Sequence, residues 1–233
     1  NKEQRGYITP QEFNLFAEQA QMEIFEQYFY DVDQRQRAAG HDIDYANIQV
    51  NIEEKIARFE KYDFNANIGA AGSIDLGVQI PNLYRLGMVK IAYQGAAHSN
   101  SGEQIQLKEL GTTAHSPLTK FTSSRPVYTM MQNDGNSGVK LKIYPHANPN
   151  MLNTVKISYV RKPEKPQWGY LVINNKALHD SSASKTTNFE LHVSEESELV
   201  YKILKFAGVA MKRDDIMRAG QGMEMAKVQQ EKQ

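Results

Sequence analysis

The sequence predicts a mixed α+β protein: a helical bundle formed by the N- and C-terminal helices, an inserted and mainly antiparallel β domain, and an extended C-terminal tail. Apolar residues recur at helical spacing near both ends, they alternate with polar residues in the middle, and the last 18 residues show neither pattern. The predicted boundaries are residues 1–64 for an N-terminal helical hairpin, 65–193 for the β domain, and 194–233 for the last bundle helix and the tail.

The composition limits the classes of function. A chain of 233 residues with 40% hydrophobic content is long enough to bury a core, in one or two domains. It has no cysteine, which excludes disulfide frameworks, thiolate metal sites and a cysteine nucleophile. No run approaches the roughly 20 consecutive apolar residues that cross a bilayer, so we expect no membrane partner.

Charge is balanced in total but not along the chain. Lys and Arg number 27, as do Asp and Glu, so no net field attracts nucleic acid or an anionic membrane. Residues 1–66 contain 7 basic and 13 acidic side chains, whereas residues 120–170 contain 8 and 2. These segments are either two unrelated solvated faces or complementary patches that orient neighbouring subunits.

The first helix is predicted at residues 9–37. Thr9 is a good N-cap, Pro10 suits the first helical position, and Glu12 completes a capping box. Apolar residues form two stripes along this helix, whereas an ordinary surface helix has one. The first stripe is Phe13, Ala17, Ala20, Ile24 and Tyr28, and the second is Leu15, Met22, Phe25, Phe29 and Val32. We therefore expect one side to face its own domain and the other to face a partner.

A second helix is predicted at about residues 47–62, where Ile48, Ile52, Ile56 and Phe59 recur at spacings of four, four and three. The two helices then form a hairpin that needs a third helix to close a core.

From Asn65 onward the pattern becomes that of strands. Strands are predicted at residues 83–93, 127–131, 139–144 and 155–160, with a further strand opened by Trp168 and a last one through Phe189, Leu191 and Val193. Residues 132–138 carry turn signals for a hairpin. By composition, residues 67–82, 96–104 and 174–188 are predicted to be loops.

The third bundle helix is predicted at residues 194–213, with Ser194 as N-cap and glutamates in its first turn. Leu199, Ile203, Ala207 and Ala210 form its core stripe, but further apolar residues leave little of its circumference polar. The tail, residues 216–233, is either disordered or ordered on another protein, and the excess apolar surface favours the second. The predicted oligomer or partner interface is Phe13, Phe16, Phe25, Phe29, Val200, Leu204, Phe206, Met211, Ile216, Met223 and Met225.

Few residues point to catalysis or a bound ion. No pair of histidines has metal-ligand spacing, and the sequence lacks a nucleophile elbow, a Walker loop and a dinucleotide fingerprint. Carboxylates at 31–33 and 42–44, with His41, lack the glycine and terminal glutamate of a calcium loop. A solvated acidic turn is favoured there over an ion site. We expect no catalytic residue, metal or cofactor.

A basic stretch of the β domain is the one feature that favours nucleic acid. Basic residues interleaved with aromatic ones on a sheet hold phosphates and stack bases. The outward face of an amphipathic sheet shows the same pattern and is favoured over a sequence-specific site, which leaves a weak contact with passing DNA. The candidate DNA-facing or inter-ring residues are Lys140, Lys142, Arg161, Lys162, Lys165 and Trp168.

Two segments, RGYITPQEFNLFAEQAQMEIFEQYF near the N-terminus and FELHVSEESELVYKILKFAGVAMKRDD near the C-terminus, resemble tail ring and head-to-tail adaptor proteins of crAss-like short-tailed phages and their marine relatives. The resemblance covers about 50 residues and both motifs are specific. It implies a non-enzymatic virion protein, assembled in the bacterial cytoplasm, that forms a ring of twelve copies around the DNA channel. Its implied partners are the portal protein, an adjacent tail ring protein and, without specificity, packaged DNA.

The resemblance also implies roles for the terminal segments: the helices at 9–37 and 194–213 would form the bundle and ring contacts, and residues 216–233 would reach a neighbouring subunit or the portal. Two alternatives come from other classes of protein. One is a soluble β-rich module that binds glycan or nucleic acid around Trp168, and the other is a hydrolase. In a third reading the tail is only a disordered terminus.

Overall fold

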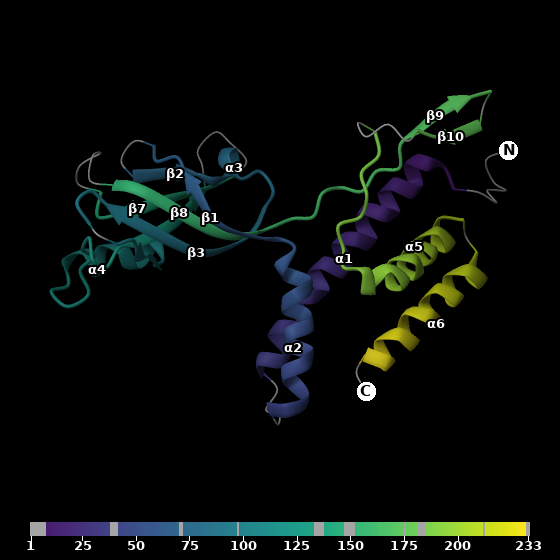
Figure 1. The fold of residues 1–233 in the computed structure, drawn as a ribbon, viewed down its shortest axis with the longest axis horizontal. Coiled ribbons are helices and arrows are strands. Elements are labelled where there is room, and N and C mark those ends of the chain that lie inside the picture. Colours follow the sequence, from purple (N-terminus) through teal and green to yellow (C-terminus); the bar gives the residue numbers. More distant parts are fainter. Residues whose placement is uncertain are drawn as a thin grey trace. The chain divides into compact units, whose positions relative to one another are not determined.

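The computed structural model in Figure 1 describes residues 8–37, 42–69, 72–96, 98–132, 138–146, 152–174, 176–180, 185–211 and 213–231. The predicted mixed α+β class is confirmed. The chain divides into two compact units, which we call the helical unit (residues 1–58 and 163–233) and the β unit (residues 59–162). The sequence-based boundaries counted residues 163–193 with the strands, whereas the structure groups them with the helices.

The helical unit contains α1 (Pro10–Arg37), α2 (Asp42–Ala57), α5 (Glu196–Ala210), α6 (Asp214–Glu231) and a hairpin of β9 (Tyr170–Ile173) and β10 (Lys176–His179). The capping box at the start of α1 is present. The Thr9 N–H donates to the Glu12 carboxylate at 3.0 Å, and the Glu12 N–H donates to Thr9 Oγ1 at 3.3 Å.

The two apolar stripes of α1 differ in how completely they are buried. In the first stripe Ala17, Ala20, Ile24 and Tyr28 are buried, as predicted. In the second, Phe25 and Phe29 are buried as well and contact each other edge to face, whereas Leu15 is exposed. The C-terminal half of α1 is therefore covered on both sides within its own unit.

Two polar side chains of α1 hold the returning chain, and sequence reasoning missed both. Gln21 is buried, and its amide donates to the Glu164 carbonyl at 2.7 Å and accepts from the Glu190 N–H at 3.1 Å. Two helical turns earlier, the Asn14 side chain donates a hydrogen bond to the Trp168 carbonyl and accepts one from the Trp168 N–H. The signal was present in the sequence, because both amides interrupt apolar positions of α1.

The C-terminal tail is not extended; this expectation was wrong. Residues 214–231 form the helix α6, which packs against α5. Two glycines permit a close approach of these helices: a Cβ on Gly208 would lie 2.6 Å from the Met217 nitrogen, and one on Gly220 would lie 3.0 Å from the Lys205 nitrogen. Gly208 and Gly220 therefore serve helix packing.

The structure differs from the prediction at the second helix, which ends earlier, and at a predicted strand, which does not form. The second helix stops at Ala57, because from Phe59 the backbone joins the sheet, where the Phe59 carbonyl accepts the Arg161 N–H at 2.9 Å. No strand forms at Phe189–Val193; a 3₁₀ turn, Val193–Glu195, leads into α5 instead. His192 rather than Ser194 caps that turn, since its ring nitrogen accepts the Ser194 N–H at 3.3 Å.

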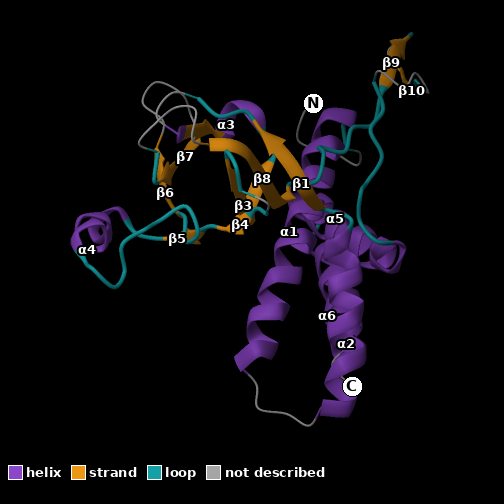
Figure 2. Ribbon diagram, turned by 60° about the vertical axis from the view of Figure 1, so that its left-hand side comes forward, coloured by secondary structure: helices purple, strands orange, loops and turns teal. Residues whose placement is uncertain are grey.

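The β unit contains two four-stranded sheets, seen in Figure 2. The first has the order β1-β8-β3-β4, with bounds Glu60–Ala66, Leu152–Arg161, Leu83–Tyr93 and Asn100–Ser101. The second has the order β2-β7-β6-β5, with bounds Ser73–Asp75, Val139–Tyr144, Val127–Gln132 and Glu103–Gln104. All pairs are antiparallel except β5 with β6. The short helices α3 (Leu76–Gln79) and α4 (Leu110–His115) lie in the connections.

One apolar core joins the two sheets of the β unit. It includes Val89 and Ile91 of β3, Ile157 of β8, and Leu141 and Ile143 of β7. The predicted alternation in β7 is confirmed, because Leu141 and Ile143 are buried whereas the neighbouring lysines are not. The predicted loops at 67–82, 96–104 and 174–188 contain short elements, since β2, α3, β4, β5 and β10 fall within them. Within the described ranges, no helix has the length and apolar character needed to cross a membrane.

The close α5–α6 packing generates a stability prediction. Gly208→Ala places a methyl group against the backbone of α6, and we expect it to lower the free energy of unfolding of the helical unit by about 1–3 kcal/mol, as overpacking does. Urea denaturation followed by far-UV circular dichroism measures the change.

Gly222→Ala is the matched control, because nothing lies within 4 Å of a Cβ at that position of α6. There we expect stabilisation of about 0.5–1 kcal/mol from helix propensity. Equal effects of the two substitutions would contradict the close packing.

Candidate interaction site

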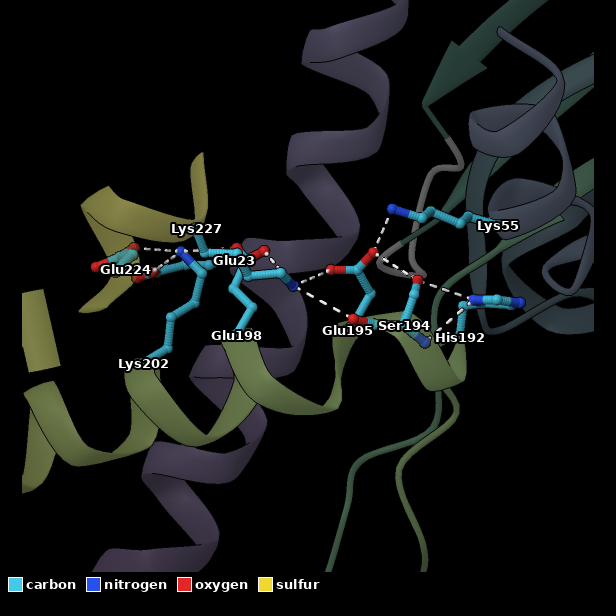
Figure 3. A network of polar contacts seen from close by, with 9 residues as sticks. All are labelled: Glu23, Lys55, His192, Ser194, Glu195, Glu198, Lys202, Glu224 and Lys227. Atoms are coloured by element: carbon cyan, nitrogen blue, oxygen red, sulfur yellow. Dashed lines mark hydrogen bonds and ion pairs between the residues drawn. The ribbon is translucent and has the colours of Figure 1, made fainter. Parts of the chain in front are cut away.

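A network of charged side chains connects α5 to α1, α2 and α6, as Figure 3 shows. Glu195, which is 2% exposed, binds Lys55 of α2 and Lys227 of α6, the latter at 3.3 Å. Glu198 lies 3.5 Å from the same Lys227 nitrogen. Ion pairs of one buried carboxylate therefore connect the start of α5 to α2 and α6.

Lys202 is the second centre of the network. It is 6% exposed, and its ammonium group lies 2.7 Å from Glu224 of α6, 3.5 Å from Glu198 and 3.8 Å from Glu23 of α1. Burial alone would lower the pKa of Lys202, but the carboxylates of Glu224, Glu198 and Glu23 raise it above its ordinary value. Lys202 thus stays charged and connects α1, α5 and α6.

Ser194, His192 and Glu195 bring a hydroxyl, an imidazole and a carboxylate together at the start of α5. His192 Nδ1 lies 2.9 Å from Ser194 Oγ, which donates to Glu195 at 3.1 Å. The hydroxyl is held between two neighbours in the chain, and Glu195 is already bound by two lysines. This arrangement serves as a helix cap.

Outside this network, α5 and α6 expose several apolar side chains among polar ones. Val200 and Leu204, one turn apart on α5, are 47% and 41% exposed, and Met223 of α6 is 49% exposed. Val200 and Leu204 lie away from Phe206, which contacts Phe16 of α1, and beside the side of α5 that meets α6, since Gly208 follows one turn after Leu204. An apolar ridge on a rigid helix pair is typical of a protein interface.

The predicted interface residues thus divide into three groups by their exposure. Phe25 and Phe29 are buried in the helical unit and present no surface to a partner. The partly buried members are Phe13, which packs edge-on against Trp168, and Phe16, Phe206, Met211 and Ile216. The exposed members are Val200, Leu204, Met223 and Met225.

The candidate DNA-facing residues also divide, since Lys140, Lys142, Arg161 and Lys162 belong to the β unit whereas Lys165 and Trp168 belong to the helical unit. Lys165 binds Glu18 at 2.6 Å. Trp168 packs against Phe13, Tyr170 and His179 and so anchors the β9–β10 hairpin to α1. Lys142 lies over the ring of Tyr144, and Arg161 lies over that of Phe59.

The β unit has a surface hollow of about 330 Å³ on the β1-β8-β3 sheet. Tyr62, Met88, Gly87 and Ser158 are among its lining residues. Beside it, Asp63 accepts from Lys90 at 2.9 Å and lies 3.6 Å from Lys156. Lys90, which lines the hollow, is thus paired with Asp63.

No cluster of three or more His, Cys, Asp or Glu side chains in the described part of the chain is arranged to hold a metal ion. The acidic loop considered above lies partly outside the described residues, since His41 and the side chains of residues 42–44 are not described. Comparison with models of protein families and with curated proteins found no match.

The buried network generates a pH prediction. Burial alone would raise the pKa of Glu195, but Lys55 and Lys227 lower it below its ordinary value of 4.5. A lowered folded-state pKa confers stability that is present above pH 4.5 and is lost as the pH falls through the lower value. We expect Glu195→Gln to reduce the free energy of unfolding at pH 7 by about 3 kcal/mol, because it leaves two ammonium groups without their carboxylate.

The same substitution should flatten the loss of stability on acidification, which urea denaturation at pH 7 and at pH 3–4 measures. Glu196→Gln is the control, since Glu196 is exposed at the next position. If Glu195→Gln and Glu196→Gln behaved alike, the network would not carry this stability.

Proposed function

We propose that the chain is a structural, non-enzymatic subunit of a phage virion that assembles into a ring of the head-to-tail connector. The observation that carries the proposal is the apolar ridge of Val200, Leu204 and Met223 on a helix pair whose own interior is already filled. Because these side chains are already about half buried, covering the rest of each contributes about 0.7–1.5 kcal/mol. A neighbouring subunit would supply that cover.

In this proposal the terminal helices form a bundle that builds the ring, and the strands between them form an inserted β domain. Twelve copies surround a channel for DNA, and the portal protein or an adjacent tail ring protein binds the assembled ring. The resemblance of both terminal segments to tail ring and adaptor proteins supports this role. The lysines and Arg161 of the β unit would give at most non-specific contact with DNA.

A binding module centred on Trp168 receives less support. The indole is flanked by Tyr170, His179 and Phe13, and the Trp168 backbone is bound by Asn14. A stacking platform for a sugar or a base needs an open aromatic face. Trp168 uses its surface to position the hairpin.

Assembly is tested by measuring the mass of the purified chain in solution with light scattering and by imaging it with negative-stain electron microscopy. We expect a concentration-dependent oligomer that includes closed rings. Val200→Glu should shift the population to monomer, because it places a charge in the buried part of the contact.

Val50→Glu is the matched control, since Val50 is an exposed helical valine of α2 in the same unit. It should assemble like the unmodified chain. A monomer at every concentration, with or without a portal protein, would refute the proposed function.

A further inference from the structure

In the described part of the chain, side chains of the same unit pack against one face of the β9–β10 hairpin and leave the other face uncovered. Among the described residues, its strands pair only with each other, in the register Leu171 with Leu178 and Ile173 with Lys176. An isolated two-stranded hairpin is marginally stable in water, and independent stability needs a third strand or a helix against one face. Four of its apolar side chains are nevertheless exposed: Leu171, Val172, Ile173 and Leu178.

Its two faces differ because side chains alternate along each strand. One face carries Tyr170 and His179, and Trp168 stacks on both rings. The opposite face carries Leu171, Leu178 and Ile173, which are 45%, 50% and 51% exposed, with Lys176 beside Ile173. We call this second set the hairpin face.

The α5–α6 pair presents a matching surface on the same unit. Lys202 and Phe206 mark the side of α5 toward α1, and Gly208 marks the side toward α6. At 3.6 residues per turn, Val200 and Leu204 project away from Lys202 and Phe206 and lie on the flank of α5 next to Gly208, and Met223 of the antiparallel α6 projects to the same side. Glu196 lies one turn before Val200 on this ridge. We call Glu196, Val200, Leu204 and Met223 the helix face.

The two faces are complementary in chemistry. Each has three apolar side chains that are about half exposed, with one charged residue at the end: Lys176 on the hairpin face and Glu196 on the helix face. Neither charge has an ion-pair partner among the described residues. An apolar centre with opposite charges at its rim is the usual anatomy of a specific contact.

We infer that the hairpin face of one subunit packs on the helix face of the next copy of this chain. A helix pair against the open side of the hairpin supplies the cover that two strands need. Because the two faces are different surfaces of the chain, the contact is heterologous, and it repeats from copy to copy until rotation closes a ring. The inference rests on the proposed function insofar as the chain must self-assemble.

A mixing experiment tests the contact. Leu178→Glu disables the hairpin face and Leu204→Glu disables the helix face, and each variant alone should remain monomeric, with its dissociation constant raised about 100-fold or more by the buried charge. When the two are mixed, the intact hairpin of the Leu204→Glu chain meets the intact helix face of the Leu178→Glu chain. Native mass spectrometry with one variant labelled with ¹⁵N should show a one-to-one heterodimer and no larger species.

Two matched controls sit on the reverse sides of the same elements. Val172→Glu lies on the other face of the hairpin, and Val209→Glu lies on α5 away from the ridge; both valines are exposed. Both variants should assemble like the unmodified chain. Heterodimer formation itself demonstrates that the two defective variants are folded.

A charge exchange provides a second test. Lys176→Glu and Glu196→Lys should each weaken assembly several-fold, because each brings like charges together, and the double variant should recover the unmodified affinity. Light scattering over a concentration series measures all three.

The outcomes separate this inference from the proposed function. A chain that never self-assembles overturns both. A chain that forms rings while the mixture of the two variants stays monomeric, or while Leu178→Glu assembles normally, overturns only the pairing of hairpin face and helix face.

Discussion

The buried carboxylate of Glu195 is the constraint on which the helical unit depends. Removing a charge from water costs several kcal/mol, so Glu195 is tolerated only because Lys55 and Lys227 reach it from two different helices. Lys202 repeats the arrangement with the opposite sign, among Glu23, Glu198 and Glu224. Any sliding of α6 along α5 would separate these partners. The network therefore fixes the register of the helices, while Gly208 and Gly220 fix how closely α6 approaches α5.

Local signals in the sequence predicted the elements that local chemistry determines. The capping box at Thr9, the first apolar stripe of α1 and the alternation along β7 all depend on residues near one another in the chain, and all three are present. The end of α2 was missed because it depends on Arg161, about a hundred residues away, whose N–H pairs with the Phe59 carbonyl. Helical spacing at Phe59 cannot reveal a sheet partner that distant.

The candidate site was predictable in kind but not in extent. Excess apolar residues on the last helix pointed to a surface, and Val200 and Leu204 are indeed exposed. Spacing alone assigned Phe25 and Phe29 to the same surface, although the unit buries them. The tail was predicted to be extended because its residues show neither helical spacing nor alternation of apolar side chains, whereas Gly220 lets α6 approach the α5 backbone. A glycine that breaks a helix and one that packs it look alike without knowledge of the neighbour.

The two ends of the β unit lie together, because the carbonyl of its first residue, Phe59, accepts the N–H of Arg161, the residue before its last, at 2.9 Å. A segment whose two ends meet can be removed, lengthened or exchanged while the gap that remains needs only a short turn to bridge it. Residues 59–162 therefore form a module that can be exchanged as one piece. The surface residues of the β unit can therefore change to suit a different binding partner, while the packing of the helices stays the same.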